Sequence, residues 1–146
     1  MANEIIRVYG TTKTLEASGA ASSSIGDFVQ ANDAAYSVSA DGSSYPDAEF
    51  VLSLTLTAAP AAMGSITLVA RPINVDGTGD TPVPDSSFPG TIIGAFPLDN
   101  TTALQYSTIV ARDVPQEAEY YLINTIAAFN SGWTLKVKPR TIKPAP

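Results

Sequence analysis

The sequence predicts an all-β fold, a two-sheet sandwich that is jelly-roll-like, and three observations predict it. Segments from residue 36 onward alternate apolar and polar side chains with the period of a strand. Turns rich in Gly, Pro, Asn and Asp separate these segments, and none shows convincing helical periodicity. The connections are long and uneven, which favours a jelly roll. An immunoglobulin-like sandwich is the alternative, although no Cys pair marks it.

The first 35 residues are expected to form a short strand followed by an extended N-terminal arm. Residues 5–9 are a short apolar run, whereas residues 10–35 are mostly small and polar. Weakly periodic segments of that length are uncommon inside compact domains. We therefore divide the single domain into an arm over residues 1–35 and a β-sandwich body over residues 36–146. Removal of residues 1–21 should then leave the melting temperature of the body almost unchanged.

The body is expected to contain one strand after another. The segments with strand character, among them one with an Asp41-Gly42 turn, are residues 36–46, 48–60, 65–73, 91–99, 103–114, 119–126 and 133–137. In the last of these, Trp133 shares one side of the strand with Leu135 and Val137, while Thr134 and Lys136 take the other side. Trp133 should therefore be buried and not exposed as a sugar-stacking platform.

The residue types that most enzymes use are missing. The chain has no His and no Cys, which removes the commonest general base, the usual zinc ligands and a thiolate nucleophile. No nucleophile elbow, phosphate-binding loop or dinucleotide fingerprint occurs. Glu117 and Glu119 lie at the start of a strand, where a solvated pair is more common than a catalytic one. We therefore expect no enzyme activity, no catalytic residue and no cofactor.

Charge and hydropathy restrict the partners. The net charge of −6 argues against nucleic acid. No apolar run approaches the roughly 20 residues of a membrane span, and no secretory signal opens the chain, so we expect synthesis in a host cytoplasm and no membrane partner. Only 15% of the residues are charged, a composition that suits packing against copies of the chain or against another protein.

One loop could bind calcium. Asp76, Asp80 and Asp85 lie in a stretch rich in Gly and Pro, and hard cations take carboxylate oxygens in such loops. The spacing does not match an EF-hand, so a polar surface turn is the competing interpretation.

Several aromatic residues are candidates for a protein interface. Tyr120 and Tyr121 are adjacent in a predicted strand, so one of them should be exposed or covered by another chain. Tyr and Phe cover much area at low entropic cost. The interface candidates are Tyr36, Tyr45, Phe88 and Tyr121.

In its whole pattern the chain resembles the small bacteriophage virion proteins that decorate or cement capsids. The resemblance rests on the short, acidic, all-β chain without Cys or His, the Ala- and Ser-rich segment "EASGAASSSIG" and the ending "YYLINTIAAFNSGWTLKVKPRTI". It implies a structural protein of the virion that binds across subunits of the major capsid protein as a homo-oligomer, a dimer or a trimer. The alternatives are a carbohydrate- or surface-binding module of a phage tail or fibre, and a tail-tube or head-completion subunit.

Overall fold

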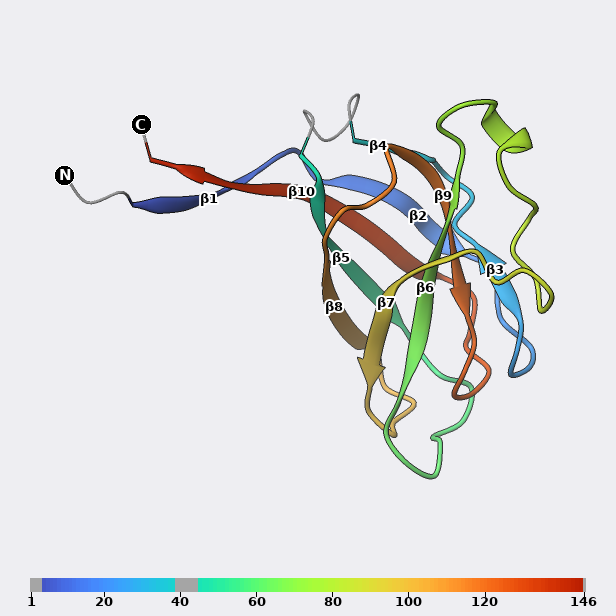
Figure 1. Cartoon of the computed structure of the whole chain (residues 1–146). Coiled ribbons are helices and arrows are strands. Elements are labelled where there is room, and N and C mark those ends of the chain that lie inside the picture. Colours follow the sequence, from blue (N-terminus) through green and yellow to red (C-terminus); the bar gives the residue numbers. More distant parts are fainter. Residues whose placement is uncertain (1–3, 39–44, 146) are drawn as a thin grey trace.

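The computed structural model describes residues 4–38 and 45–145, and they form a sandwich of two antiparallel sheets (Figure 1). In the first sheet the order is β2 (Lys13–Gly19), β10 (Trp133–Pro144), β5 (Asp47–Leu54) and β8 (Gln105–Ala111), and β1 (Ile5–Tyr9) pairs with the far end of β10. In the second sheet β3 (Phe28–Gln30) and β4 (Tyr36–Ser37) pair with β9 (Glu117–Ile123), which is followed by β6 (Gly64–Pro72) and β7 (Thr91–Leu98). A short 3₁₀ turn, η1 (Gly77–Gly79), lies between β6 and β7.

The strand order confirms the predicted jelly roll. The chain crosses between the sheets at the β2–β3, β4–β5, β5–β6, β7–β8, β8–β9 and β9–β10 connections, and β6–β7 is a hairpin within one sheet. If β1 and β2 count as one interrupted strand, and β3 and β4 as another, each sheet has four positions. Their order is that of a double Greek-key jelly roll. The predicted Asp41-Gly42 turn lies outside the described residues.

The core fills the space between the two sheets, and the alternation in the sequence places it there. On β5, Ala48, Phe50, Leu52 and Leu54 are buried, and β6 and β9 bury their own alternate residues in the same way. The rings of Phe50 and Tyr120 join the two sheets, with centroids 5.1 Å apart. Burial of each large apolar side chain contributes about 1.5–3 kcal/mol. The two sheets are thereby fixed face to face.

The prediction for Trp133 is confirmed. The side chain is buried, and its Nε1 donates a hydrogen bond to the carbonyl oxygen of Ala20 at 2.7 Å. The Phe129 ring packs edge-on against the indole with 6.2 Å between centroids. Trp133 therefore closes one end of the core and offers no platform to a ligand.

The prediction of a loose arm over residues 1–35 is wrong for most of that segment. β2 pairs with the first half of β10, Leu15 is fully buried, and β3 pairs with β9. Small polar residues fit these edge strands because only one side of each strand meets the core. A boundary at residue 35 therefore cuts through the sheets, and residues 1–21 include part of the core.

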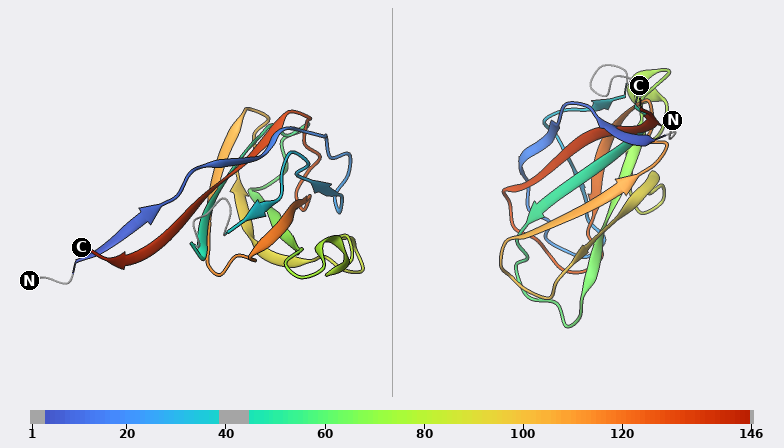
Figure 2. Two further views of the ribbon diagram at one scale, coloured as in Figure 1. Left: turned by 90° about the horizontal axis from the view of Figure 1, so that it is seen from above. Right: turned by 90° about the vertical axis from the view of Figure 1, so that its left-hand side faces the viewer.

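The part of the N-terminal segment that leaves the body is β1. It pairs with residues 140–144 of β10, from Tyr9 opposite Arg140 to Ile5 opposite Pro144. Together the two strands form a ribbon that projects away from the sandwich (Figures 1 and 2), and at its tip Glu4 and Ala145 are hydrogen-bonded. We call this pair of segments, residues 5–9 and 140–144, the β1–β10 ribbon.

Candidate functional site

A nearly uncharged side of the sandwich is formed by β7 and β8. These edge strands of opposite sheets lie next to each other, so that a Cβ atom on Gly94 would come within 2.9 Å of the Ile109 side chain. The segment Thr91–Ala111, which comprises both strands and their connection, contains one charged residue, Asp99. We call the exposed surface of these strands and of the turns at their ends the β7–β8 side.

Large apolar side chains are exposed on this β7–β8 side. Tyr106 is 73% exposed and lies with Val110 on the outer face of β8, and Met63 and Leu104 are exposed near the start of that strand. Ile92, which is 69% exposed, pairs with Val69 and lies on the outer face of the second sheet. Isolated exposed apolar residues are common in monomers, but a group of them on one face, as at Met63, Leu104 and Tyr106, is typical of a surface that binds another molecule. The sequence carries a signal for it, because Tyr106 and Val110 alternate with residues that face the core.

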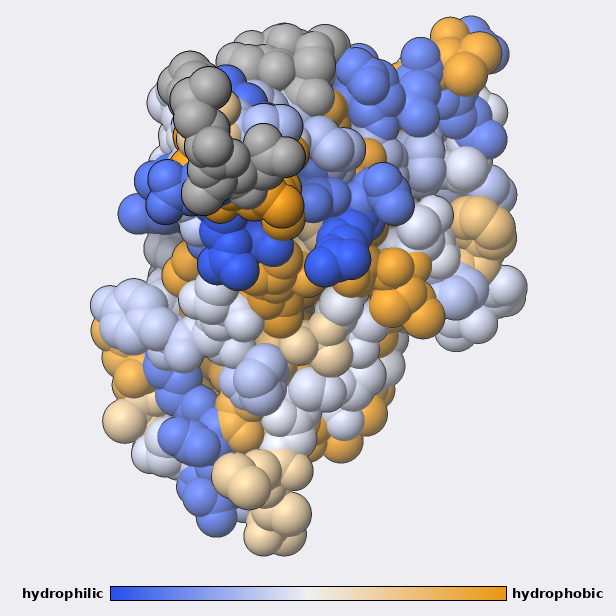
Figure 3. Space-filling view, turned by 60° about the vertical axis from the view of Figure 1, so that its left-hand side comes forward, coloured by the Kyte–Doolittle hydropathy of each residue, from blue (hydrophilic) through white to orange (hydrophobic). Residues whose placement is uncertain are grey.

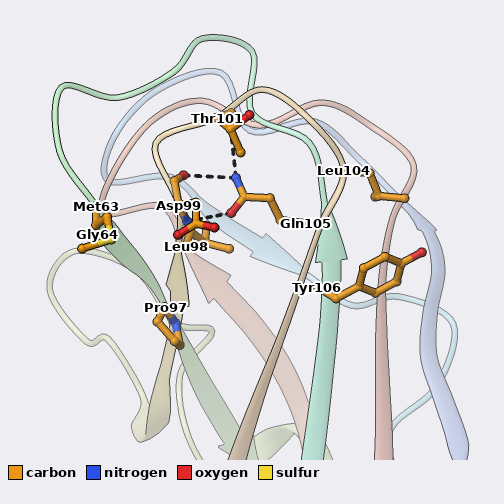
Figure 4. Close-up of a pocket in the computed structure, with 9 residues that line it drawn as sticks. All are labelled: Met63, Gly64, Pro97, Leu98, Asp99, Thr101, Leu104, Gln105 and Tyr106. Atoms are coloured by element: carbon orange, nitrogen blue, oxygen red, sulfur yellow. Dashed lines mark hydrogen bonds between the residues drawn. The ribbon is translucent and has the colours of Figure 1, made fainter.

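A groove lies at one end of the β7–β8 side, with a volume of about 590 Å³ (Figure 4). Met63, Pro97, Leu104 and Tyr106 are among its lining residues. The Gln105 side chain is fully engaged in the turn beside it: its Oε1 accepts from the Asp99 N–H, and its Nε2 donates to the carbonyls of Asp99 and Thr101. The groove is therefore a hollow lined by both apolar and polar residues, beside a hydrogen-bonded turn.

Two of the four predicted interface residues are buried within the chain. Tyr36 is fully buried and Tyr121 is 4% exposed, so the prediction that they offer a surface to a partner is wrong. Tyr36 faces the core from β4. Phe88 is 40% exposed and Tyr45 is half-buried, which leaves both accessible.

Tyr121 points to the outer face of the second sheet, and it is buried because this face is covered. Its register partner Val69, on the same face, is also fully buried. The loop of residues 73–90 is tied to this face by Arg71, which donates to the carbonyls of Thr78 and Thr81 and pairs with Glu119 at 3.1 Å. Burial, with the Glu119 carboxylate nearby, raises the pKa of the Tyr121 phenol. Sequence periodicity shows alternation within a strand but not a loop that covers its outer side.

The calcium prediction is not supported by the geometry. Within residues 4–38 and 45–145, no three His, Cys, Asp or Glu side chains are grouped as a metal ion would require. Asp80 accepts from the N–H groups of Val75 and Asp76, and Asp85 accepts from those of Ser87 and Phe88. The carboxylates of Asp80 and Asp85 therefore cap separate turns, and the surface-turn interpretation describes this loop better.

A polar cluster near the start of β3 is also structural. Asp27 accepts hydrogen bonds from the N–H groups of Ser23 and Ser24 and from both hydroxyls. Chiefly through the backbone bond from Ser24, these interactions lower the pKa of Asp27 to about 2. Buried Asn124 donates to Ser22 Oγ and to the Ser24 carbonyl. The cluster thus fixes the turn before β3.

Comparisons with known proteins do not place the chain in a family. No protein-family model and no curated protein matches it. A solved structure matches, described as "Bacillus endospore appendages form a novel family of disulfide-linked pili". The match has 15% sequence identity and a TM-score of 0.29, and it covers 100% of this chain and 96% of that chain. A likeness of that size carries no argument about function. Among the described residues, no helix has the length and apolar character needed to cross a membrane.

Proposed function

We propose that this protein is a structural protein of a virus particle that decorates or cements a phage capsid by binding across subunits of the major capsid protein. The observation that carries the proposal is the nearly uncharged β7–β8 side, with Tyr106 and Val110 exposed on the outer face of β8. Covering apolar surface of this kind with a partner is favourable by about 25 cal/mol per Å² of buried area. The jelly roll, which also occurs in viral capsid domains, is compatible with the proposal without proving it.

The contact need not be strong in a single copy. A protein repeated around a closed shell sums many weak contacts, and each copy that is bound at two points holds its second point at high effective concentration. A rigid sandwich suits this role because little conformational entropy is lost when it binds. The proposed protein is not an enzyme and requires no cofactor.

Quantitative mass spectrometry of density-purified particles tests the proposal. This chain is counted against the major shell protein in particles from a culture that produces it. A fixed ratio equivalent to tens to hundreds of copies per particle is expected, because a decoration protein repeats with the lattice. A handful of copies would indicate a tail or portal location, and absence from the particles would overturn the proposal.

A carbohydrate- or surface-binding module is the second candidate, and one observation favours it. Tyr106 is exposed at the groove of about 590 Å³, where its ring could stack on a sugar beside Asp99. A glycan array with the intact chain and with Tyr106→Ala distinguishes the two. Binding that the substitution abolishes would support this candidate, whereas no binding to any glycan would count against it.

A further inference from the structure

The β1–β10 ribbon is a projecting element without a described partner on either outer edge. The pairing of β10 with β5 ends at Arg140, and β1 pairs with β10 alone among the described strands. Its two strands therefore leave backbone donors and acceptors unpaired on both sides. Ribbons of two strands are marginally stable in water by themselves, and open edges are templates for pairing with another chain.

The ribbon is basic and partly apolar. Its charged residues are Arg7, Lys143 and Arg140, of which Arg140 is buried and pairs with Glu49 at 3.0 Å. Residues 5–9 and 140–144 contain no carboxylate, and Glu4 follows at the tip, where its carbonyl accepts from the Ala145 N–H. Ile5 is 71% exposed and Ile142 49%, on the same face as Arg7. The side of the molecule toward which the ribbon projects accordingly shows orange patches next to the deepest blue (Figure 3).

The cations of the whole chain are concentrated in this region. Of its eight Lys and Arg residues, six lie on β1, β2 and β10: Arg7, Lys13, Lys136, Lys138, Arg140 and Lys143. The net charge of the whole chain is nevertheless −6, and Glu16 on β2 and Glu49 on β5 lie among these cations. The cations are therefore gathered on one part of the molecule, whereas carboxylates are spread over the whole chain.

The 73–90 loop has the complementary character. It contains Asp76, Asp80 and Asp85 and no Lys or Arg, and Glu117 lies beside it, with its N–H bonded to Asn74. Exposed apolar side chains accompany the carboxylates: Val75, Val83 and Phe88. Figures 1 and 2 place this loop on the opposite side of the body from the ribbon.

We propose that the β1–β10 ribbon of one copy docks on the 73–90 loop of a second copy. Charge decides between the two ways in which copies could join through the ribbon. Ribbon against ribbon would bring cations together, which is unfavourable across an interface, whereas ribbon against loop pairs opposite charges. The loop is already ordered by Arg71 and by its own capped turns, so docking would cost it little entropy.

Such a contact joins two different surfaces and is therefore heterologous. Repetition of it produces a ring when the rotation closes and an open chain when it does not. The inference goes beyond the proposed function and stands without it, because copies could join in solution whether or not they bind a capsid. If the chain is absent from virus particles, the proposed function fails but the contact between copies is not affected. If the chain is monomeric, the contact between copies fails but the number of copies per particle is not affected.

Charge reversal in the full chain tests the contact by sedimentation velocity at low and high salt. The ribbon variant is Arg7→Glu with Lys143→Glu, and the loop variant is Asp76→Lys with Glu117→Lys; all four side chains are exposed. The unmodified chain should associate at low salt and less at high salt. Each variant alone should need at least about tenfold more protein to associate.

Mixing supplies the decisive comparison. An equimolar mixture of the two variants should regain association, because every contact between unlike copies again pairs opposite charges. The matched control is Arg112→Glu with Lys136→Glu, two exposed cations outside the ribbon and with the same change of net charge as the ribbon variant. It should associate like the unmodified chain.

Three results would overturn the inference. One is an unmodified chain that stays monomeric at low salt at every soluble concentration. This result would show that the ribbon does not bind a second copy, and an acidic protein of another kind would then be its expected partner. Another is unchanged association of the ribbon variant. The third is a mixture of the two variants that remains as weakly associated as each variant alone.

Discussion

The indole of Trp133 occupies the space where a side chain on Gly19 would be. A Cβ atom at Gly19 would lie 2.0 Å from Cε2 of Trp133, closer than any real contact. The two residues are register partners on β10 and β2, and the Nε1 bond to Ala20 fixes the ring in that position. This pair joins the N-terminal segment to the core of the sandwich.

Gly19→Ala should therefore destabilise the fold by about 1–3 kcal/mol or more, because the added methyl group forces the indole out of its site. Urea unfolding followed by Trp133 fluorescence measures the change in the free energy of unfolding. Ser18→Ala, at the exposed neighbouring position in β2, is the matched control and should change it little. Equal stability of Gly19→Ala and the unmodified chain would contradict the packing described.

Tyr120→Phe should leave the stability unchanged or raise it by about 1 kcal/mol. The Tyr120 hydroxyl is buried without a hydrogen-bond partner among the described residues, and burial raises the pKa of this phenol. A buried hydroxyl without a partner costs its desolvation free energy, and the substitution by Phe removes this cost. Thermal unfolding checks this, with exposed Tyr106→Phe as the control. A clear loss of stability would show that the hydroxyl has a partner.

Asp27 should make the stability depend on pH at the acid end. Hydrogen bonds lower its pKa from 3.8 to about 2, so the folded state holds the carboxylate ionised where the unfolded chain is already protonated. The contribution is complete above pH 3.8 and is lost as the pH falls through about 2. The advantage over Asp27→Asn should therefore shrink between these values in urea unfolding. A difference independent of pH would refute the assignment.

Truncation separates the ribbon from the body. Deletion of residues 1–7 removes most of β1, which lies outside the core, and should leave the melting temperature of the body nearly unchanged. Deletion of residues 1–21 also removes β2 with buried Leu15 and the Gly19 partner of Trp133, so the chain should fail to fold. Circular dichroism at rising temperature measures both. Normal melting of the longer deletion would restore the loose-arm interpretation.

Much of the fold could be predicted from periodicity, because strands that bury one face alternate strictly. The alternation on β5, β6 and β10 identified those strands. Because Trp133 shares one side of β10 with Leu135 and Val137, it could be identified as a core residue. The uneven connections indicated the jelly roll. These features are local, so one sequence is enough to reveal them.

The rest depends on contacts between distant segments. β2 looks like loose chain because its residues are small and polar, and its place follows from the Gly19 contact with Trp133, 114 positions away in the sequence. Tyr121 looks exposed until the 73–90 loop is placed on the second sheet. The β7–β8 side could have been found, since a run from Thr91 to Ala111 with one charge is visible in the sequence.

Cosedimentation with particles that lack this protein tests the central claim, that the β7–β8 side binds a capsid, most directly. The unmodified chain is compared with Tyr106→Asp/Val110→Asp, which puts charge on exposed positions of β8, and with Thr14→Asp/Lys136→Asp on the exposed surface of the first sheet. The account predicts saturable binding by the unmodified chain and the control and at least about tenfold weaker binding by the β8 variant. Equal binding by all three, or no binding by the unmodified chain, would contradict it.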